Sequence, residues 1–147
     1  MEDTIDIRNI IDAIDARNVV LIGMPGAGKS TIGVMLAKTL GMCFIDTDLI
    51  VQEKEGKLLQ DIINTYGINR FLKIEEEAIL SLTQKSAVIA TGGSAVYSEK
   101  SVMHLKQRGI VIYLKVEYEE IARRIKNIST RGVVMDKGQS LINIYNQ

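Results

Sequence analysis

Short apolar runs alternate with longer amphipathic segments along most of the chain. Residues 18–23, 42–48, 86–93 and 110–114 are rich in β-branched and apolar side chains and are bounded by glycine or polar residues. Such runs are typical of strands buried on both faces of a sheet. The segments between them have helical spacing, so the pattern predicts a parallel sheet covered by helices on both faces.

The predicted helices differ in how clearly the sequence marks their ends. Residues 1–17 and 117–127 are amphipathic, and residues 98–109 predict a helix that ends at Gly109. Residues 49–85 predict two or three helices, broken near Gly56 and Gly67. Residues 29–41 predict a helix that ends at a glycine, with an apolar stripe formed by Ile32, Met35, Leu36 and Leu40.

Length and composition favour one ordinary globular domain. A chain of 147 residues is long enough for a single core and short for two. Lys plus Arg and Asp plus Glu both number 18, and no apolar run is long enough to span a bilayer, so neither a nucleic-acid nor a membrane partner is expected. The single cysteine, Cys43, cannot form an internal disulfide, and no secretory signal is visible. A cytoplasmic protein is therefore predicted.

The stretch "GMPGAGKS", which follows the first predicted strand, matches the pattern G-x-x-x-x-G-K-[ST]. Glycines in this pattern permit positive φ angles, so that backbone N–H groups converge on phosphate oxygens at a helix N-terminus. The lysine supplies a charge to the β and γ phosphates, and the hydroxyl that follows is the usual protein ligand of Mg2+. We therefore predict an ATP and Mg2+ site whose nucleotide-binding residues are Gly23, Gly26, Ala27, Gly28, Lys29, Ser30 and Thr31.

Two further loops follow predicted strands and should lie at the same edge of the sheet. Asp46 and Asp48 come at the end of the second strand, where one carboxylate can support Mg2+ and the other can orient or deprotonate an acceptor hydroxyl. A solvated acidic turn is the alternative. Gly92 and Gly93 follow the third strand, where their amides can meet a ligand, or they can form a purely structural turn.

A cationic segment near the C-terminus has the character of a lid. Residues 127–138 carry Arg131 beside a glycine and could close over the phosphates to neutralise developing charge and exclude water, although an ordinary surface loop is the alternative. The acidic run Glu75–Glu77 is interpreted as a solvated helix face, and His104 as a surface residue rather than a catalyst.

Taken in order, the motifs "GMPGAGKSTIG", "FIDTD", Phe71-x-x-x-Glu75, "ATGGS" and "IYL", with the arginines at 124 and 131, resemble those of the shikimate kinases. The resemblance covers residues 18–147. It implies an α/β fold, a P-loop three-layer sandwich in which a parallel sheet carries helices on both faces, with an acceptor-binding helical segment at 47–86 and a lid. It also implies that Asp46 serves Mg2+, Asp48 contacts the acceptor hydroxyl, Arg124 lies against adenine and Arg131 is the lid arginine.

Several positions depart from the family pattern. Leu72 stands where the family has an arginine that holds the shikimate carboxylate, and Ser94 replaces the third glycine of its turn. Loss of one charge-assisted contact to a carboxylate would weaken binding by about one to two orders of magnitude. The chain also ends where the family continues, so we expect it to lack the C-terminal helix and the last strand, and to be a monomer, or a dimer if this leaves a sheet edge exposed.

The sequence thus predicts one P-loop kinase domain, residues 1–147, with an N-terminal helical extension at 1–17. The leading hypothesis is an ATP-dependent kinase that phosphorylates a hydroxyl of shikimate. Its predicted catalytic residues are Lys29, Asp48 and Arg131, and its predicted acceptor-binding residues are Asp48, Gly92, Gly93 and position 72. The alternatives are a kinase for another small acceptor (gluconate, a nucleoside or a nucleotide), favoured by Leu72, and a nucleotide-binding module with little catalysis.

Overall fold

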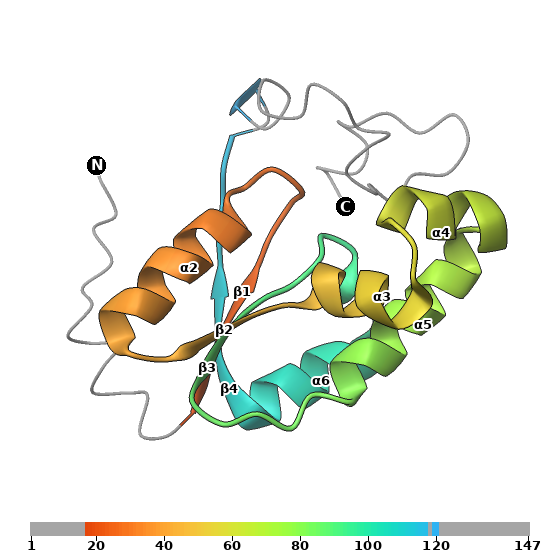
Figure 1. Ribbon diagram of the computed structural model, residues 1–147. Helices are drawn as coiled ribbons and strands as arrows, with labels where there is room; N and C mark the ends of the chain where they lie inside the picture. The colour runs from red at the N-terminus through yellow and green to blue at the C-terminus, as the bar shows by residue number, and fades with distance from the viewer. Residues whose placement is uncertain (1–16, 118, 121–147) are drawn as a thin grey trace.

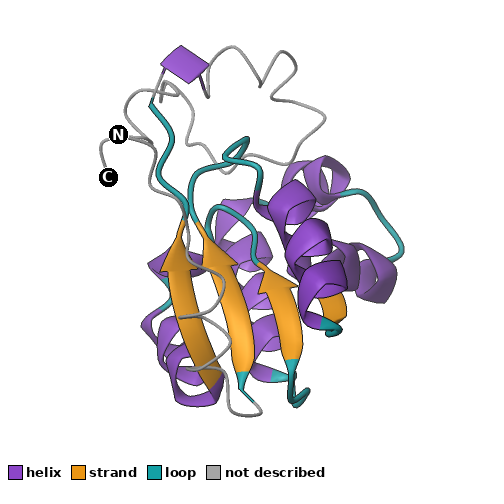
Figure 2. Ribbon diagram, turned by 90° about the vertical axis from the view of Figure 1, so that its left-hand side faces the viewer, coloured by secondary structure: helices purple, strands orange, loops and turns teal. Residues whose placement is uncertain are grey.

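The computed structural model describes residues 17–117, 119 and 120. Within them, four parallel strands form one sheet in the order β2-β3-β1-β4. The strands are β1 (Asn18–Ile22), β2 (Cys43–Asp46), β3 (Ala87–Ala90) and β4 (Gly109–Tyr113). Figure 2 shows the arrowheads at one edge of the sheet, with the connecting loops beyond them. The α/β class and the four strands expected from the sequence are therefore confirmed.

Helices lie on both faces of the sheet, as Figure 1 shows. One face is covered by α2 (Lys29–Leu40), and the other by α5 (Ile68–Leu80) and α6 (Glu99–Arg108). The remaining described elements are α3 (Thr47–Glu55), α4 (Leu59–Tyr66) and the short 3-10 helix η1 (Ala95–Tyr97). None of the helices in the described residues is both long and apolar enough to cross a membrane.

Alternating side chains of β1 connect the two layers of core. Val19 and Leu21 pack with Ala37 of α2, whereas Val20 packs with Ile79 of α5 and with α6. All of these side chains are at most 4% exposed. A third apolar cluster joins α3, α4 and α5 to one another, so these three helices form one packed unit beside the sheet.

The buried face of α2 coincides only in part with the apolar stripe expected from the sequence. Ile32 and Met35 are 37% and 64% exposed, while Gly33 and Ala37 are buried. A Cβ at Gly33 would lie 2.6 Å from the ring of Phe44, so the small residue is what allows α2 to lie close to the sheet. Leu36 and Leu40 of the stripe do pack against the core, but the closest contact with the sheet is made by small residues, because close packing there selects small side chains.

The connections create a crevice at the carboxyl edge of the sheet. After β1 the chain crosses the α2 face, and after β3 it continues into η1 and α6 on the opposite face. Because β1 and β3 are neighbours, their loops diverge at this edge, which is where ligands bind in open α/β sheets. The expected helix at 1–17, the lid at 127–138, Arg124 and Arg131 lie wholly or mainly outside the described residues.

Candidate active site

The loop between β1 and α2 has the backbone that a phosphate-binding loop requires. Gly23, Gly26 and Gly28 have φ angles of 149°, 80° and 92°, which L side chains rarely adopt. A Cβ at Gly23 would also lie 2.7 Å from the carbonyl oxygen of Leu114. The positive φ angles expected for these glycines are therefore confirmed, and the loop leads directly into the N-terminus of α2 at Lys29.

The Lys29 side chain is held inside this loop and is only 8% exposed. Its Nζ donates hydrogen bonds to the carbonyl oxygens of Gly23 and Met24, at 2.6 and 2.8 Å. Burial lowers the pKa of Lys29 to about 8, although Asp48 and Asp46 partly oppose that shift. A phosphate anion at the loop would favour the charged ammonium and so reduce the cost of its burial.

Ser30 and Asp46 place two oxygen donors beside the loop. The Ser30 hydroxyl donates to Asp46 Oδ2 at 2.9 Å, and Asp46 Oδ1 accepts from the backbone N–H of Asp48 at 2.9 Å. In the part of the chain that the structure describes, no cluster of three or more His, Cys, Asp or Glu side chains could hold a metal. One hydroxyl and one carboxylate nevertheless fit Mg2+, which usually keeps several waters and takes further oxygens from substrate phosphates.

The second strand ends differently from the expected acidic turn. Asp46 is the last residue of β2 and the N-cap of α3, so Asp48 lies in the first turn of a helix rather than in a loop. Thr47 Oγ1 accepts a hydrogen bond from the Gly92 N–H at 3.1 Å, which ties the loop after β3 to the start of α3. This contact brings Asp48 and Gly92, 44 positions apart in sequence, into one site.

Glu75 is the acidic residue whose environment the sequence interpretation missed. It is 3% exposed and lines the same cavity as Lys29 and Asp48, so the interpretation of Glu75–Glu77 as a solvated face is wrong for its first member. Glu76 accepts a hydrogen bond from Ser98 and lies 3.6 Å from Lys73, while Glu77 is exposed. The available signal was the spacing from Phe71, because residues four apart share a helix face and a large aromatic is normally buried.

The two carboxyl groups converge on the loop after β3. A Cβ at Gly92 would lie 2.6 Å from both Asp48 Oδ1 and Glu75 Oε2, so a side chain here would force these carboxyl groups to shift. Burial, reinforced by Asp46, raises the pKa of Asp48 to about 6. Burial, reinforced by Asp48, raises the pKa of Glu75 to about 7, against the opposing hydrogen bond from Ser94. Perturbed carboxyl groups in a cleft are candidates for proton transfer or ligand binding.

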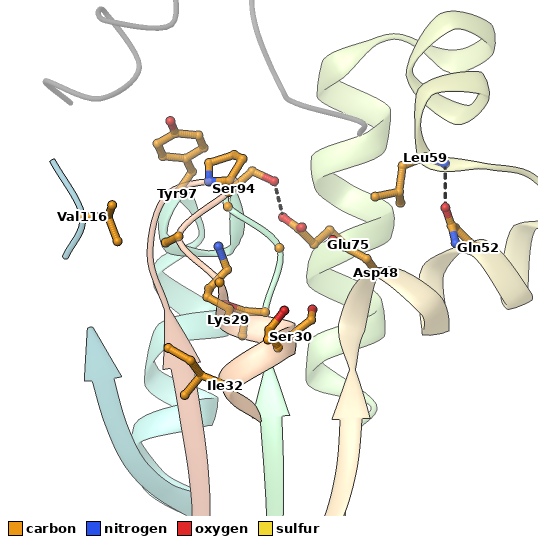
Figure 3. A pocket seen from close by; sticks show the side chains of 18 of the residues that line it. Lys29, Ser30, Ile32, Asp48, Gln52, Leu59, Glu75, Ser94, Tyr97 and Val116 are labelled. Carbon is orange, nitrogen blue, oxygen red and sulfur yellow. Dashed lines mark hydrogen bonds between the residues drawn. The ribbon is translucent and has the colours of Figure 1, made fainter. Parts of the chain in front are cut away.

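These groups line one cavity of about 870 Å3, shown from close by in Figure 3. That volume falls in the range of small-molecule and cofactor sites. The structure brings most of the sequence-predicted residues to its wall, and it adds others that were not expected. The predicted members are Gly26, Ala27, Gly28, Lys29, Ser30, Thr31, Asp48, Gly92 and Gly93; the additions include Gln52, Leu59, Phe71, Glu75 and Tyr97.

Leu72 does not line this cavity. It packs against the apolar cluster of α3, α4 and α5 and borders a smaller pocket of about 270 Å3, which shares Glu75, Ser94 and Tyr97 with the main cavity. Position 72 thus lies beside the main cavity, and its part in acceptor binding stays a prediction. The Leu72 side chain lies next to the site and helps to pack α5 against α3 and α4.

The stability of the fold should decline as the pH rises, because of Glu75. In the folded chain its carboxyl keeps the proton to about pH 7, whereas in the unfolded chain it loses the proton near pH 4.5. The folded state thus binds more protons between these values, and at about 1.4 kcal/mol per pKa unit the free energy of unfolding falls by about 2.5 kcal/mol between pH 5 and pH 8. Asp48 acts in the same direction.

Urea denaturation at the two pH values would measure this contribution. We expect Glu75→Gln to reduce the decline by about 2.5 kcal/mol, because an amide does not titrate. The exposed Glu77→Gln should leave the decline unchanged. An equal decline in wild type and Glu75→Gln would mean that the buried carboxyl does not carry it.

Comparisons with known proteins agree with this geometry. The family model for shikimate kinase matches residues 25–146. The shikimate kinase of Actinobacillus succinogenes is 42% identical over 124 residues, which cover 81% of this chain and 71% of that protein. That of Geobacter sulfurreducens is 43% identical over 121 residues, or 82% of this chain and 67% of that protein.

Solved structures of shikimate kinases also resemble this chain. Shikimate kinase from Acinetobacter baumannii, in complex with shikimate, superposes with a TM-score of 0.77 at 36% identity, covering 82% of this chain and 69% of that one. The enzyme from Aquifex aeolicus superposes with a TM-score of 0.71 at 31% identity, covering 88% and 76%. The family model spans most of the chain, and several relatives are more than 30% identical over most of its length, so the chain belongs to the shikimate kinase family.

Proposed function

We propose that this chain is a shikimate kinase, which transfers the γ-phosphate of ATP to a hydroxyl of shikimate. The observation that carries the proposal is the single cavity in which a phosphate-binding loop faces a pair of carboxyl groups. The loop supplies a nucleotide site and the carboxyl groups supply hydrogen-bond acceptors for a polyol. Membership of the family and the shikimate bound to the Acinetobacter baumannii relative make shikimate the leading acceptor.

In the proposed reaction, the loop amides and Lys29 hold the β and γ phosphates. An acceptor hydroxyl held by Asp48 gives up its proton to that carboxylate as its oxygen bonds to the γ-phosphorus, and the bond from the γ-phosphorus to the β–γ bridging oxygen breaks to release ADP. Ser30 and Asp46 would hold Mg2+, whose charge neutralises the phosphate oxygens. From the family resemblance, Arg124 would lie against adenine and Arg131 would act from the lid.

We also propose which segments of the domain bind the acceptor and close the site. Residues 47–86, which contain α3, α4 and α5, would form the acceptor-binding segment, since Asp48 and Glu75 both come from it. Residues 127–138 would form the lid. A cytoplasmic location and a monomeric state stay predictions from the sequence.

Coupled measurement of ADP release from Mg-ATP, with and without shikimate, tests the function directly. Shikimate-dependent turnover is the expected result. Release that requires gluconate, a nucleoside or a nucleotide instead would identify a kinase for another acceptor. An absence of turnover with every acceptor, combined with ATP binding, would contradict the kinase proposal and leave a nucleotide-binding module.

Leu72 is the observation that favours another acceptor. Among the described residues that line the cavity, Lys29 is the only cation, so the described part of the acceptor end offers no partner for a carboxylate. We expect Leu72→Arg to tighten shikimate binding by about tenfold or more, because one charge-assisted hydrogen bond is worth roughly 1.5 to 3 kcal/mol.

Titration calorimetry with shikimate would measure this gain. Leu72→Met is the matched control, since it keeps an apolar side chain of similar size and should bind as the wild type does. If Leu72→Arg binds no more tightly, either position 72 is not in register with the family arginine or shikimate is not the acceptor.

A further inference from the structure

The α2 side of strand β4 is only partly covered by the elements that the structure describes. Ile110 and Ile112 of β4 pair with Val19 and Leu21 of β1, and residues two apart on a strand share a face. The two β1 side chains are at most 1% exposed beneath α2, whereas the two β4 side chains are half-buried. The cause is that α2 packs mainly on β3, β2 and β1, so an apolar strip along β4 stays partly exposed.

One flank of α2 continues this apolar strip. Leu36 is half-buried and packs in the same cluster as Ile112, and Ile32, one turn earlier on the helix, is 37% exposed. Val116, beyond the end of β4, lines the main cavity together with Ile32, so this flank of α2 is turned toward β4 (Figure 3). We call the surface formed by Ile32, Leu36, Ile110 and Ile112 the β4 face.

The N-terminal segment, residues 1–16, carries the apolar side chains that could cover such a surface. Its isoleucines recur at intervals of three and four residues, at Ile7, Ile10, Ile11 and Ile14. On a helix they would form one stripe about 100° wide, with acidic residues on the other sides. A single helix of this length is marginal in water, so its stability would come mainly from burying that stripe against the domain.

The entry of this segment into the sheet places it beside the β4 face. It leads into Asn18, the first residue of β1, which pairs with Gly109 at the start of β4. Three residues, 15–17, separate Ile14 from β1, which is within the usual length of a connection from a helix to a strand. A helix from Ile7 to Ile14 would span about 11 Å, and the five residues of β4 span about 17 Å. The stripe therefore fits along the strand.

We propose that residues 1–16 fold back on the domain as an amphipathic helix and that its isoleucine stripe packs on the β4 face. In that position the helix contacts the flank of α2, whose N-terminus carries the phosphate-binding residues. The proposal does not depend on the identity of the acceptor or on catalysis. The other candidate occupants are the C-terminal segment, residues 121–147, and a second copy of the chain, and the experiments below distinguish them.

Thermal melts of full-length variants test whether the stripe is buried. Ile11→Asp should lower the melting temperature by about 5 °C or more, because it places a charge among apolar side chains. It should also increase binding of the dye ANS several-fold, because the β4 face becomes exposed. Ile5→Asp is the matched control, since Ile5 lies about 200° around the helix from Ile7 and should melt as the wild type does. Equal melting temperatures for the two variants would overturn the proposal.

A double-mutant cycle, measured by urea denaturation, tests where the stripe packs. If Ile11 contacts the β4 face, the loss of stability in the double variant of Ile11→Ala and Ile112→Ala should be smaller than the sum of the single losses. Ile63→Ala is the control partner, because Ile63 packs in the cluster of α3, α4 and α5, and its effect should add to that of Ile11→Ala. Additive losses for Ile11 and Ile112 would place the segment elsewhere and overturn the proposal.

Two further outcomes identify a different occupant. If Ile142→Ala is coupled to Ile112→Ala and Ile11→Ala is not, the C-terminal segment covers the β4 face. If size-exclusion chromatography shows a wild-type dimer that Ile11→Asp converts to a monomer, the stripe of one copy covers the β4 face of another. Either result would overturn the proposal. The expected result is coupling between Ile11 and Ile112 in a chain whose oligomeric state Ile11→Asp leaves unchanged.

Discussion

Lys29→Met is expected to lower kcat/KM for ATP by about a thousandfold or more while the protein stays folded. Lys29 is the cation of the phosphate-binding loop, and a charge that stabilises the transferring phosphoryl group in a closed site is worth roughly this factor. In the ligand-free chain its charge is disfavoured, since burial lowers its pKa to about 8 from the usual 10.5. Replacing it with a neutral side chain of similar length removes that cost, so the fold should tolerate the change.

Steady-state kinetics and a thermal melt on the same preparation would test both parts of this expectation. Lys38→Met is the control, because Lys38 is exposed on the last turn of the same helix and should have wild-type kinetics. Turnover near the wild-type level in Lys29→Met would contradict the assignment of the loop. A large fall in melting temperature would show instead that the hydrogen bonds from Lys29 to Gly23 and Met24 hold the loop together.

Local patterns were sufficient to predict the fold and the backbone of the loop between β1 and α2. The apolar runs of β1 and β3 are buried along almost their whole length, as their composition predicts. Glycines at positive φ are required by the loop itself, as Gly26 and Gly28 show. The C-terminal ends of α2 and α3 could also be predicted from the sequence, because each is followed by a glycine, Gly41 or Gly56, that adopts the left-handed C-cap conformation. Each of these features depends on residues close together in sequence.

The acceptor half depends on contacts between distant residues, and there the sequence was less informative. Three consecutive acids suggest a solvated surface, but Glu75 is buried because α5 packs against the loop that carries Ser94, 19 positions away. Position 72 illustrates the reverse case. The family resemblance predicts that this residue binds the acceptor; the structure packs its side chain among three helices beside the cavity, and the role stays a prediction. Neither the burial of Glu75 nor the packing of Leu72 follows from helical periodicity alone.

Asp48→Asn is expected to lower kcat by roughly a hundredfold or more, the usual contribution of a positioned general base. Asp48 lines the cavity within reach of the loop after β3, and it is the carboxyl assigned to the reacting hydroxyl. Asparagine keeps the size of the side chain and an oxygen acceptor but cannot take a proton. The loss should therefore fall mainly on kcat, with a smaller effect on the KM for the acceptor.

The dependence of the rate on pH separates this role from simple binding. A base works only when deprotonated, and because burial raises the pKa of Asp48 to about 6, wild-type kcat should fall as the pH drops below that value. The residual kcat of Asp48→Asn should not fall in this way at low pH, because asparagine does not titrate. Asp61→Asn, an exposed aspartate on α4, is the control and should keep both the rate and the profile of the wild type. If Asp48→Asn raises KM alone and keeps kcat with its acid limb, Asp48 binds the acceptor but does not take its proton, and another group must accept it.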